Sequence, residues 1–223
     1  MESNKKLIRY LKKLKIRGYV EIPRDVFMSE AQEKAVEKEI RKFLKKYGET
    51  SRHLGIPSQL LHRFDDFDSL GLRQMRDIMV DISEAFSLAL PLENFTLDNL
   101  ALRISRDSNP PVGYIHSDSD YFATVYSFGF PGPWVFLRDS NGQLRVRKVP
   151  PHRLTAISGM IREEALSIIA PSHSSPLITM VERLSWTSFY CKEPDKKTRL
   201  RCFNRSSIVK NELKKRGITA RAR

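Results

Sequence analysis

Two side chains that can bind a metal lie two residues apart in the segment G-Y-I-H-S-D-S-D-Y-F, residues 113–122. They are His116 and Asp118, and the surrounding residues have the composition of a β-strand. Residues i and i+2 of a strand point to the same side, so both side chains can face one interior, together with Tyr114. This spacing predicts the first half of a metal site. The alternative is an ordinary polar turn, because His-x-Asp is a common pattern.

A third ligand has to come from elsewhere in the chain, and the other histidines are the candidates. They are His53, His62, His152 and His173. The first two lie in the half of the chain predicted to be helical, and His152 lies in a turn. His173, in A-P-S-H-S-S-P, lies between two predicted strands. Two histidines and a carboxylate that leave neighbouring coordination positions open are typical of a non-heme Fe(II) site.

An arginine follows His173 by ten residues, inside a strand whose polarity alternates. The alternation predicts one face made of Val181, Arg183, Ser185, Thr187 and Phe189. Burying a guanidinium is unfavourable unless it meets an anion. Its planar fork and a neighbouring hydroxyl are well shaped for one carboxylate. We therefore expect Arg183 and Ser185 to bind a carboxylate inside the fold.

The order His-x-Asp, a histidine 57 residues after the first, and Arg-x-Ser ten residues later resembles the Fe(II)/2-oxoglutarate-dependent oxygenases. The resemblance covers about residues 99–192. It implies that His116, Asp118 and His173 are the catalytic iron ligands. It also implies that Arg183 and Ser185 bind the distal carboxylate of the co-substrate 2-oxoglutarate, with O₂ as the oxidant.

The elements that must position these residues fall into two halves. In the first half, an apolar stripe with Leu7 and Leu11 predicts an N-terminal helix, and residues 18–23 predict a strand. Ser29 and Gln32 form a capping box that opens a helix to about Tyr47. Another helix is expected over about 69–88.

From Asn99 the apolar period shortens and predicts eight short strands. They are expected at residues 99–105, 113–116, 121–128, 134–138, 143–149, 154–158, 165–170 and 182–190. The segment D-S-N-G, residues 139–142, predicts a tight hairpin. A last helix is expected from about 206 to 216, ended by Gly217.

This order predicts an α+β fold whose many short strands close into a sandwich or a jelly-roll barrel. The resemblance implies that this barrel is a double-stranded β-helix (cupin-like) preceded by N-terminal helices. We divide the chain into a helical support region over 1–98, a catalytic core over 99–195 and a basic C-terminal extension over 196–223.

The positive charge is concentrated at the two ends of the chain. Of the net +13, residues 1–17 contribute +6 and residues 196–223 contribute +10, so the middle carries −3. The ends are therefore expected either to contact nucleic acid or another acidic partner, or to be solvated. Two cysteines, no apolar run long enough to span a membrane and no secretory leader predict a cytoplasmic protein.

The substrate is expected to be a small molecule, such as an amino acid or a derivative. Tyr114, Arg103 and Trp134 are candidate substrate contacts, with core packing or a solvated face as the alternative for each. The N-terminal layout is similar to that of bacterial free amino-acid hydroxylases. Alkylated-nucleic-acid demethylases are a second possibility, although their second arginine is replaced here by Phe189. A macromolecular substrate and a non-catalytic cupin-like metal-binding module complete the alternatives.

Overall fold

A computed structural model gives the fold of the chain. It describes residues 2–47, 49–50, 57–61, 65–91, 97–105, 115–118, 122–138, 141–159, 170–174, 183–190 and 196–218. Tyr114 and residues 165–169 of the strand expected at 165–170 lie outside the described residues, and the last residue of that segment, Ala170, is not part of a strand. None of the described helices is both long and apolar enough to cross a membrane.

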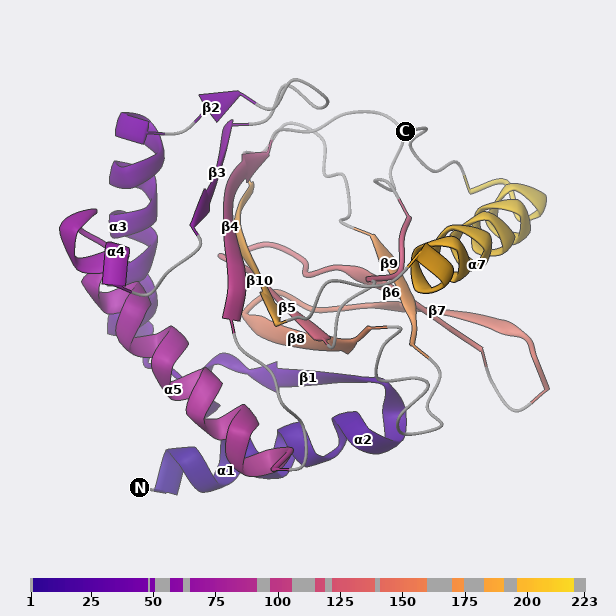
Figure 1. Cartoon of the computed structure of the whole chain (residues 1–223), viewed down its shortest axis with the longest axis horizontal. Coiled ribbons are helices and arrows are strands. Elements are labelled where there is room, and N and C mark those ends of the chain that lie inside the picture. The colour runs from indigo at the N-terminus through magenta and orange to yellow at the C-terminus, as the bar shows by residue number, and fades with distance from the viewer. Residues whose placement is uncertain are drawn as a thin grey trace.

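Helices form the first half of the chain and its C-terminal end. They are α1 (Glu2–Lys12), α2 (Leu14–Arg17), the 3-10 helix η1 (Arg24–Val26), α3 (Glu30–Tyr47), α4 (Asp65–Ser69), α5 (Arg73–Ala89) and α7 (Lys196–Lys215). Helix α5 packs against both α1 and α3 on one side of the molecule, whereas α7 lies at the opposite side (Figure 1).

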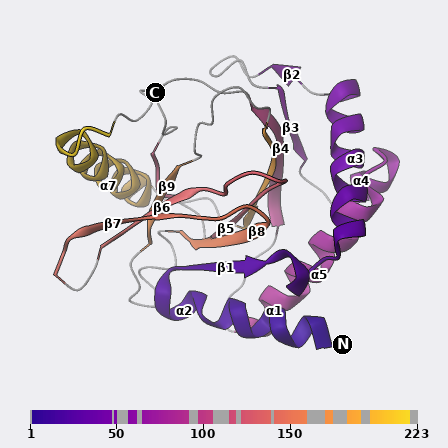
Figure 2. The same cartoon turned by 180° about the vertical axis from the view of Figure 1, so that it is seen from behind.

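The strands form two sheets, and every strand pair in them is antiparallel. The seven-stranded sheet has the order β1-β8-β5-β10-β4-β3-β2 and the three-stranded sheet has the order β7-β6-β9. The bounds are β1 (Tyr19–Pro23), β2 (Glu49–Thr50), β3 (Pro57–Leu61), β4 (Leu97–Ser105), β5 (Phe122–Ser127), β6 (Trp134–Arg138), β7 (Leu144–Lys148), β8 (Arg153–Ser158), β9 (Ser172–Ser174) and β10 (Arg183–Tyr190). The view from behind shows the same two groups of strands between the helical layer and α7 (Figure 2).

The large core lies between the helices and the outer face of the seven-stranded sheet. Leu102, Trp186 and Tyr126 supply the sheet side of this core, and the apolar faces of α1, α3 and α5 cover it. Phe86 of α5 stacks on Phe122 of β5, with ring centroids 4.1 Å apart. Burial of these apolar side chains fixes which face of the sheet packs against the helices, because neighbouring residues of a strand alternate between faces.

A buried carboxylate connects the helical layer to the sheet. Glu33 of α3 accepts hydrogen bonds from the Tyr126 hydroxyl of β5 and from Arg24 at 3.0 Å, and pairs with His152 Nδ1 at 2.8 Å. His152 has a left-handed backbone (φ 55°), which this contact and the Arg24 N–H bond to its carbonyl help to hold. Desolvation raises the pKa of Glu33, but the bonds from Tyr126, His152 and Arg24 outweigh it and lower the pKa below its ordinary value.

The predicted elements of the first half are confirmed, with adjusted bounds. The capping box is present in full: Ser29 N–H donates to Gln32 Oε1 at 2.8 Å, and Gln32 N–H donates to Ser29 Oγ at 3.2 Å. The helix expected over 69–88 begins at Arg73, because Gly71 takes a left-handed turn (φ 75°) between α4 and α5. Strands β2 and β3 were not predicted in this half.

The strands predicted in the second half are present at β4, β5, β6, β7, β8 and β10, and β6 and β7 pair as the expected hairpin. Of the segment expected at 113–116, the structure describes residues 115–116, where His116 forms an isolated bridge. The short strand β9 around His173 was not predicted, and α7 begins at Lys196, about ten residues earlier than expected. The described chain therefore combines helices with two antiparallel sheets.

Candidate metal centre and anion site

A backbone bridge brings two of the predicted ligands together. His116 N–H donates to the His173 carbonyl at 3.0 Å, and His173 N–H donates to the His116 carbonyl at 2.7 Å. The hydroxyls of Ser117 and Ser172 also hydrogen-bond across the bridge at 2.8 Å. The two imidazole rings therefore lie side by side, with centroids 4.3 Å apart.

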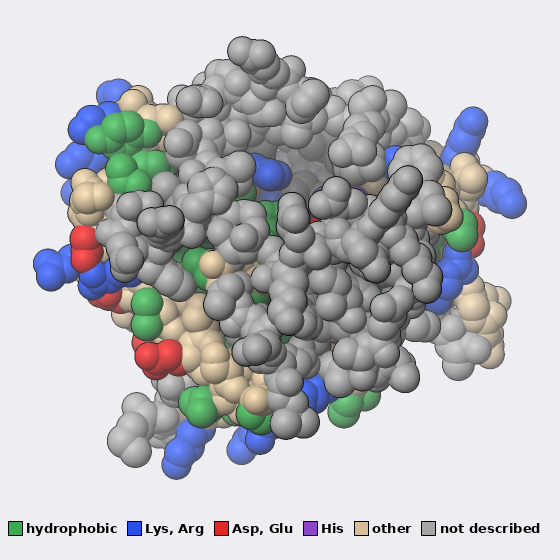
Figure 3. All heavy atoms as spheres, in the orientation of Figure 1, with side chains coloured by type: hydrophobic (Ala, Val, Ile, Leu, Met, Phe, Trp, Pro, Cys, Tyr) green, Lys and Arg blue, Asp and Glu red, His purple; other side chains and the backbone are tan. Residues whose placement is uncertain are grey.

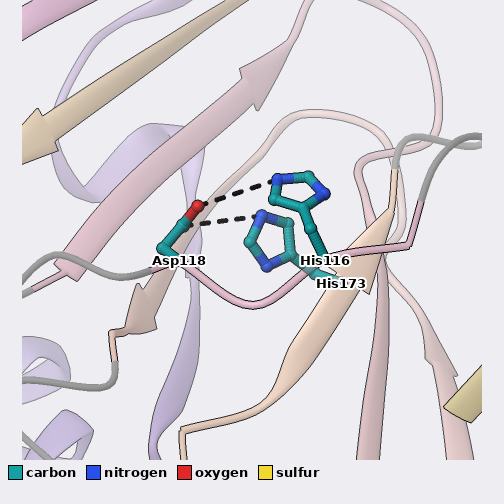
Figure 4. Close-up of side chains that lie close together, drawn as sticks. All are labelled: His116, Asp118 and His173. Atoms are coloured by element: carbon teal, nitrogen blue, oxygen red, sulfur yellow. Dashed lines mark ion pairs between the residues drawn. The ribbon is translucent and has the colours of Figure 1, made fainter. Parts of the chain in front are cut away.

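Asp118 points at both imidazoles (Figure 4). Its Oδ1 is 3.7 Å from His116 Nε2, and its Oδ2 is 3.5 Å from His173 Nε2. One donor atom from each of the three residues lies within 4.8 Å of the other two. The structure thus brings together the three residues that the sequence predicted as metal ligands.

Burial and charge distinguish this cluster from an ordinary polar turn. The side chains of Asp118 and His173 are 6% and 5% exposed, whereas that of His116 is 40% exposed. Burial lowers the pKa of His173 to about 4, although Asp118 opposes the shift, so the imidazole is neutral at pH 7 and can coordinate a cation. His173 Nδ1 is buried and has no hydrogen-bond partner among the described residues.

The cluster faces the space between the two sheets. His173 is paired with Val135 of β6, and these directly opposite residues share one face of the small sheet. Val135 packs with Ile157 of β8, which belongs to the seven-stranded sheet. The face of the small sheet that carries His173 therefore points toward the inner face of the large one.

Arg183 and Ser185 lie on that inner face of the large sheet. Their alternation with Leu184 and Trp186, which belong to the outer core, confirms the predicted facing of β10. Both are buried, at 4% and 5% exposure. Arg183 Nε donates to Ser127 Oγ at 3.1 Å. Burial, and then repulsion by Arg103, lower the pKa of Arg183 to about 10, so it remains a cation at pH 7.

Ser127 was not found from the sequence. It lies at the end of β5, directly opposite Ser185 in the register of β5 and β10. The pattern of β5 indicated that Ser127 shares a face with Val125, but the sequence did not show which strand would pair with it. The result is a group of one guanidinium and two hydroxyls, from Arg183, Ser185 and Ser127, on the same interior surface.

The three candidate substrate contacts have different placements. Arg103 of β4 is partly buried and directly opposite Ser185, so it faces the interior. Trp134 precedes Val135 in β6 and lies on the other face, where it packs with the cluster of Ile115, Phe136 and Leu144. The Lys148 ammonium lies 4.5 Å from its ring centroid. The structure therefore does not bring Trp134 to the metal ligands.

The three metal-ligand candidates and the arginine site lie on opposite inner faces of the two sheets. Figure 3 shows a hollow near the centre of one side of the molecule, with Lys or Arg atoms visible inside it. Two imidazoles and a carboxylate suit a divalent cation such as Fe(II), and the guanidinium with two hydroxyls suits a carboxylate. The donor chemistry present thus fits both groups that the resemblance implied.

Comparison with known proteins supports the fold. No protein-family model and no curated protein matches the sequence. Among solved structures, a prolyl hydroxylase from Trichoplax adhaerens in complex with a hypoxia inducible factor peptide fragment is 13% identical, with a TM-score of 0.61. The match covers 89% of this chain and 93% of that one.

Two further solved structures match the chain with similar TM-scores and sequence identities. A Pseudomonas putida prolyl-4-hydroxylase is 16% identical, with a TM-score of 0.57 over 83% of this chain and 99% of that one. A dioxygenase for auxin oxidation from Arabidopsis thaliana, solved with 2-oxoglutarate, is 12% identical, with a TM-score of 0.55 over 86% and 89% of the two chains. The resemblance to the 2-oxoglutarate-dependent oxygenases is therefore confirmed at the level of the fold.

Proposed function

We propose that this chain is an Fe(II)- and 2-oxoglutarate-dependent oxygenase built on a double-stranded β-helix. The observation that carries the proposal is that His116, Asp118 and His173 converge on one point. A buried arginine with two serine hydroxyls faces them from the other sheet. The division of the described strands into two antiparallel sheets supports such a β-helix.

Each of these residues has a task in the proposed reaction. His116, Asp118 and His173 would hold Fe(II), and Arg183 with Ser185 and Ser127 would hold the distal carboxylate of 2-oxoglutarate. When bound, iron and 2-oxoglutarate together supply the oxidation of a C–H bond by O₂, with release of succinate and CO₂. The protein orients the co-substrate through Arg183 and keeps the two facing surfaces largely dry.

The proposed substrate is a small molecule such as an amino acid or a derivative, which would be hydroxylated. Arg103 remains a candidate contact, because it faces the same interior. Tyr114 remains a prediction from the sequence, since it lies outside the described residues. The placement of Trp134 favours packing over substrate contact.

Anaerobic spectroscopy tests the proposal directly. Metal-free protein is titrated with Fe(II) and then with 2-oxoglutarate, and the visible metal-to-ligand charge-transfer band is recorded. We expect a band in the wild type and none in His116→Ala. His152→Ala is the matched control, because His152 contacts Glu33 on the helical side and should leave the band intact.

Arg183→Ala tests the co-substrate site in the same titration. Removing one partner of a buried charged hydrogen bond costs about 2–5 kcal/mol, so 2-oxoglutarate should bind at least about 30-fold more weakly. Arg145→Ala, a change at an exposed position of β7, should leave the affinity unchanged. Iron binding without any band would contradict the use of 2-oxoglutarate, and the absence of iron binding would contradict the metal site itself.

A macromolecular substrate is the second candidate, and the basic C-terminal helix bears on it. The solved prolyl hydroxylase named above holds a peptide fragment. Deleting α7 is a poor test, since its Val209 and Leu213 pack on Ile115, next to His116. Reversing the exposed charges of Lys214 and Lys215 leaves that packing intact. Turnover of a small substrate should survive this change, whereas turnover that depends on an acidic partner should fall.

A further inference from the structure

Arg103 gives the interior a second cation beside the proposed co-substrate site. In the pairing of β4 and β10, Arg103 is opposite Ser185, and Arg183 is opposite Ser105. Directly opposite residues share a face, so both arginines point into the same interior as diagonal neighbours. The repulsion that helps to lower the pKa of Arg183 comes from Arg103, which agrees with this placement.

In the part of the chain that the structure describes, Arg103 has no carboxylate within ion-pair distance. Burial lowers its pKa, and the acid that opposes this shift is Asp118, one of the proposed iron ligands. An arginine remains charged even after such a shift. A partly buried cation that forms no ion pair with a described carboxylate raises the affinity of the site for an anion.

The carboxylate that Arg183 would bind is not well placed to contact Arg103 as well. In the sheet order, β10 lies between β5 and β4. Arg183 Nε donates to Ser127 on β5, which lies on the side of β10 away from β4. A carboxylate held by Arg183 together with Ser127 would lie toward β5, which leaves Arg103 available to a different group.

We propose that Arg103 binds a carboxylate of the primary substrate, so that the substrate of this chain is a carboxylic acid. The inference rests on the proposed function and narrows its substrate class. Because the guanidinium fork binds both oxygens of a carboxylate, Arg103 would set which part of the substrate lies over the iron ligands.

The test compares a carboxylate with an uncharged molecule of the same shape. The anaerobic wild-type complex with Fe(II) and saturating 2-oxoglutarate is titrated with propionate, propionamide or inorganic phosphate at constant ionic strength, and the charge-transfer band is followed. We expect propionate to shift the band with saturation, and the amide and phosphate to have little effect. Arg103→Gln should weaken propionate binding by about tenfold or more, and Arg103→Lys by less.

The affinity for 2-oxoglutarate serves as the internal control. It should stay within about threefold of the wild-type value in Arg103→Gln, which also shows that the variant is folded. A loss as large as that in Arg183→Ala would mean that Arg103 binds the co-substrate, and it would overturn the inference. Equal binding of propionate and propionamide would overturn it as well, and a stronger response to phosphate would replace the carboxylate with a phosphate group.

A second arm does not depend on iron or on 2-oxoglutarate. Propionate is titrated by calorimetry into metal-free Arg183→Gln, which keeps Arg103, and into Arg183→Gln/Arg103→Gln. Binding that only the first variant shows supports the inference even if the charge-transfer band is absent and the proposed function fails. Equal binding by both variants, with the band present, refutes the inference and leaves the proposed function intact.

Discussion

The contact between Glu33 and its three partners allows a quantitative test of how the helical layer is held to the sheet. Glu33→Gln removes the negative charge and places an amide group among Tyr126, Arg24 and His152. Hydrogen bonds to charged groups contribute about 1.5–3 kcal/mol each, and disrupting a buried ion pair costs about 3–5 kcal/mol. Because the amide oxygen still accepts one bond, we expect the free energy of unfolding to fall by about 3 kcal/mol.

The effect should depend on pH in a defined direction. The folded-state pKa of Glu33 lies below the ordinary value of 4.5, so its charge stabilises the folded protein above about pH 4.5. This stabilisation is lost as the pH falls from 4.5 through the lower, folded-state pKa. The difference between wild type and Glu33→Gln should therefore be complete at pH 7 and shrink below pH 4.5.

Urea unfolding at several pH values measures this difference. Near pH 7 the loss corresponds to a melting temperature lower by about 6–12 °C for a chain of this size. Glu37→Gln, on the same helix and paired with Arg41 at the surface, should cost only about 0.5 kcal/mol. A penalty for Glu33→Gln that is no larger than this control, or one that grows toward low pH, would refute the reasoning.

Two further substitutions test the anion site and the core. Ser127→Ala removes the hydroxyl that accepts from Arg183 Nε and should weaken 2-oxoglutarate binding by about tenfold, as measured by the anaerobic titration. An unchanged affinity would show that Ser127 does not help to place the guanidinium. Phe86→Ala removes the ring stacked on Phe122 and should lower the free energy of unfolding by about 3–5 kcal/mol in urea. A loss below 1 kcal/mol would contradict the packing described for α5.

Local signals in the sequence were sufficient to predict several elements. Ser29 and Gln32 predicted the start of α3, because a capping box needs only residues three apart. The alternation along β10 predicted that Arg183 and Ser185 point inward, since one strand carries that information by itself. The three metal-ligand candidates came from residue chemistry and from the resemblance, and the structure places them together.

Contacts between distant segments could not be predicted in the same way. Strand β9 has three residues, too few for a periodic pattern, and it exists because β6 and His116 pair with it. Ser127 meets Ser185 only through the register of β5 and β10, which neither strand specifies alone. For the same reason, the sequence did not show whether the Arg103 side chain faces solvent or the interior. The pairing of β4 with β10 places it toward the interior.

The reciprocal bridge between His116 and His173 has a consequence for how the protein can change over time. Because backbone bonds and the Ser117–Ser172 contact set the separation of the two imidazoles, that separation does not depend on the length of the loops between the intervening strands. A slip of a single residue at the bridge, in contrast, would turn one imidazole to the opposite face. New substrate preferences can therefore arise by exchange of those loops, while the bridge itself tolerates no insertion.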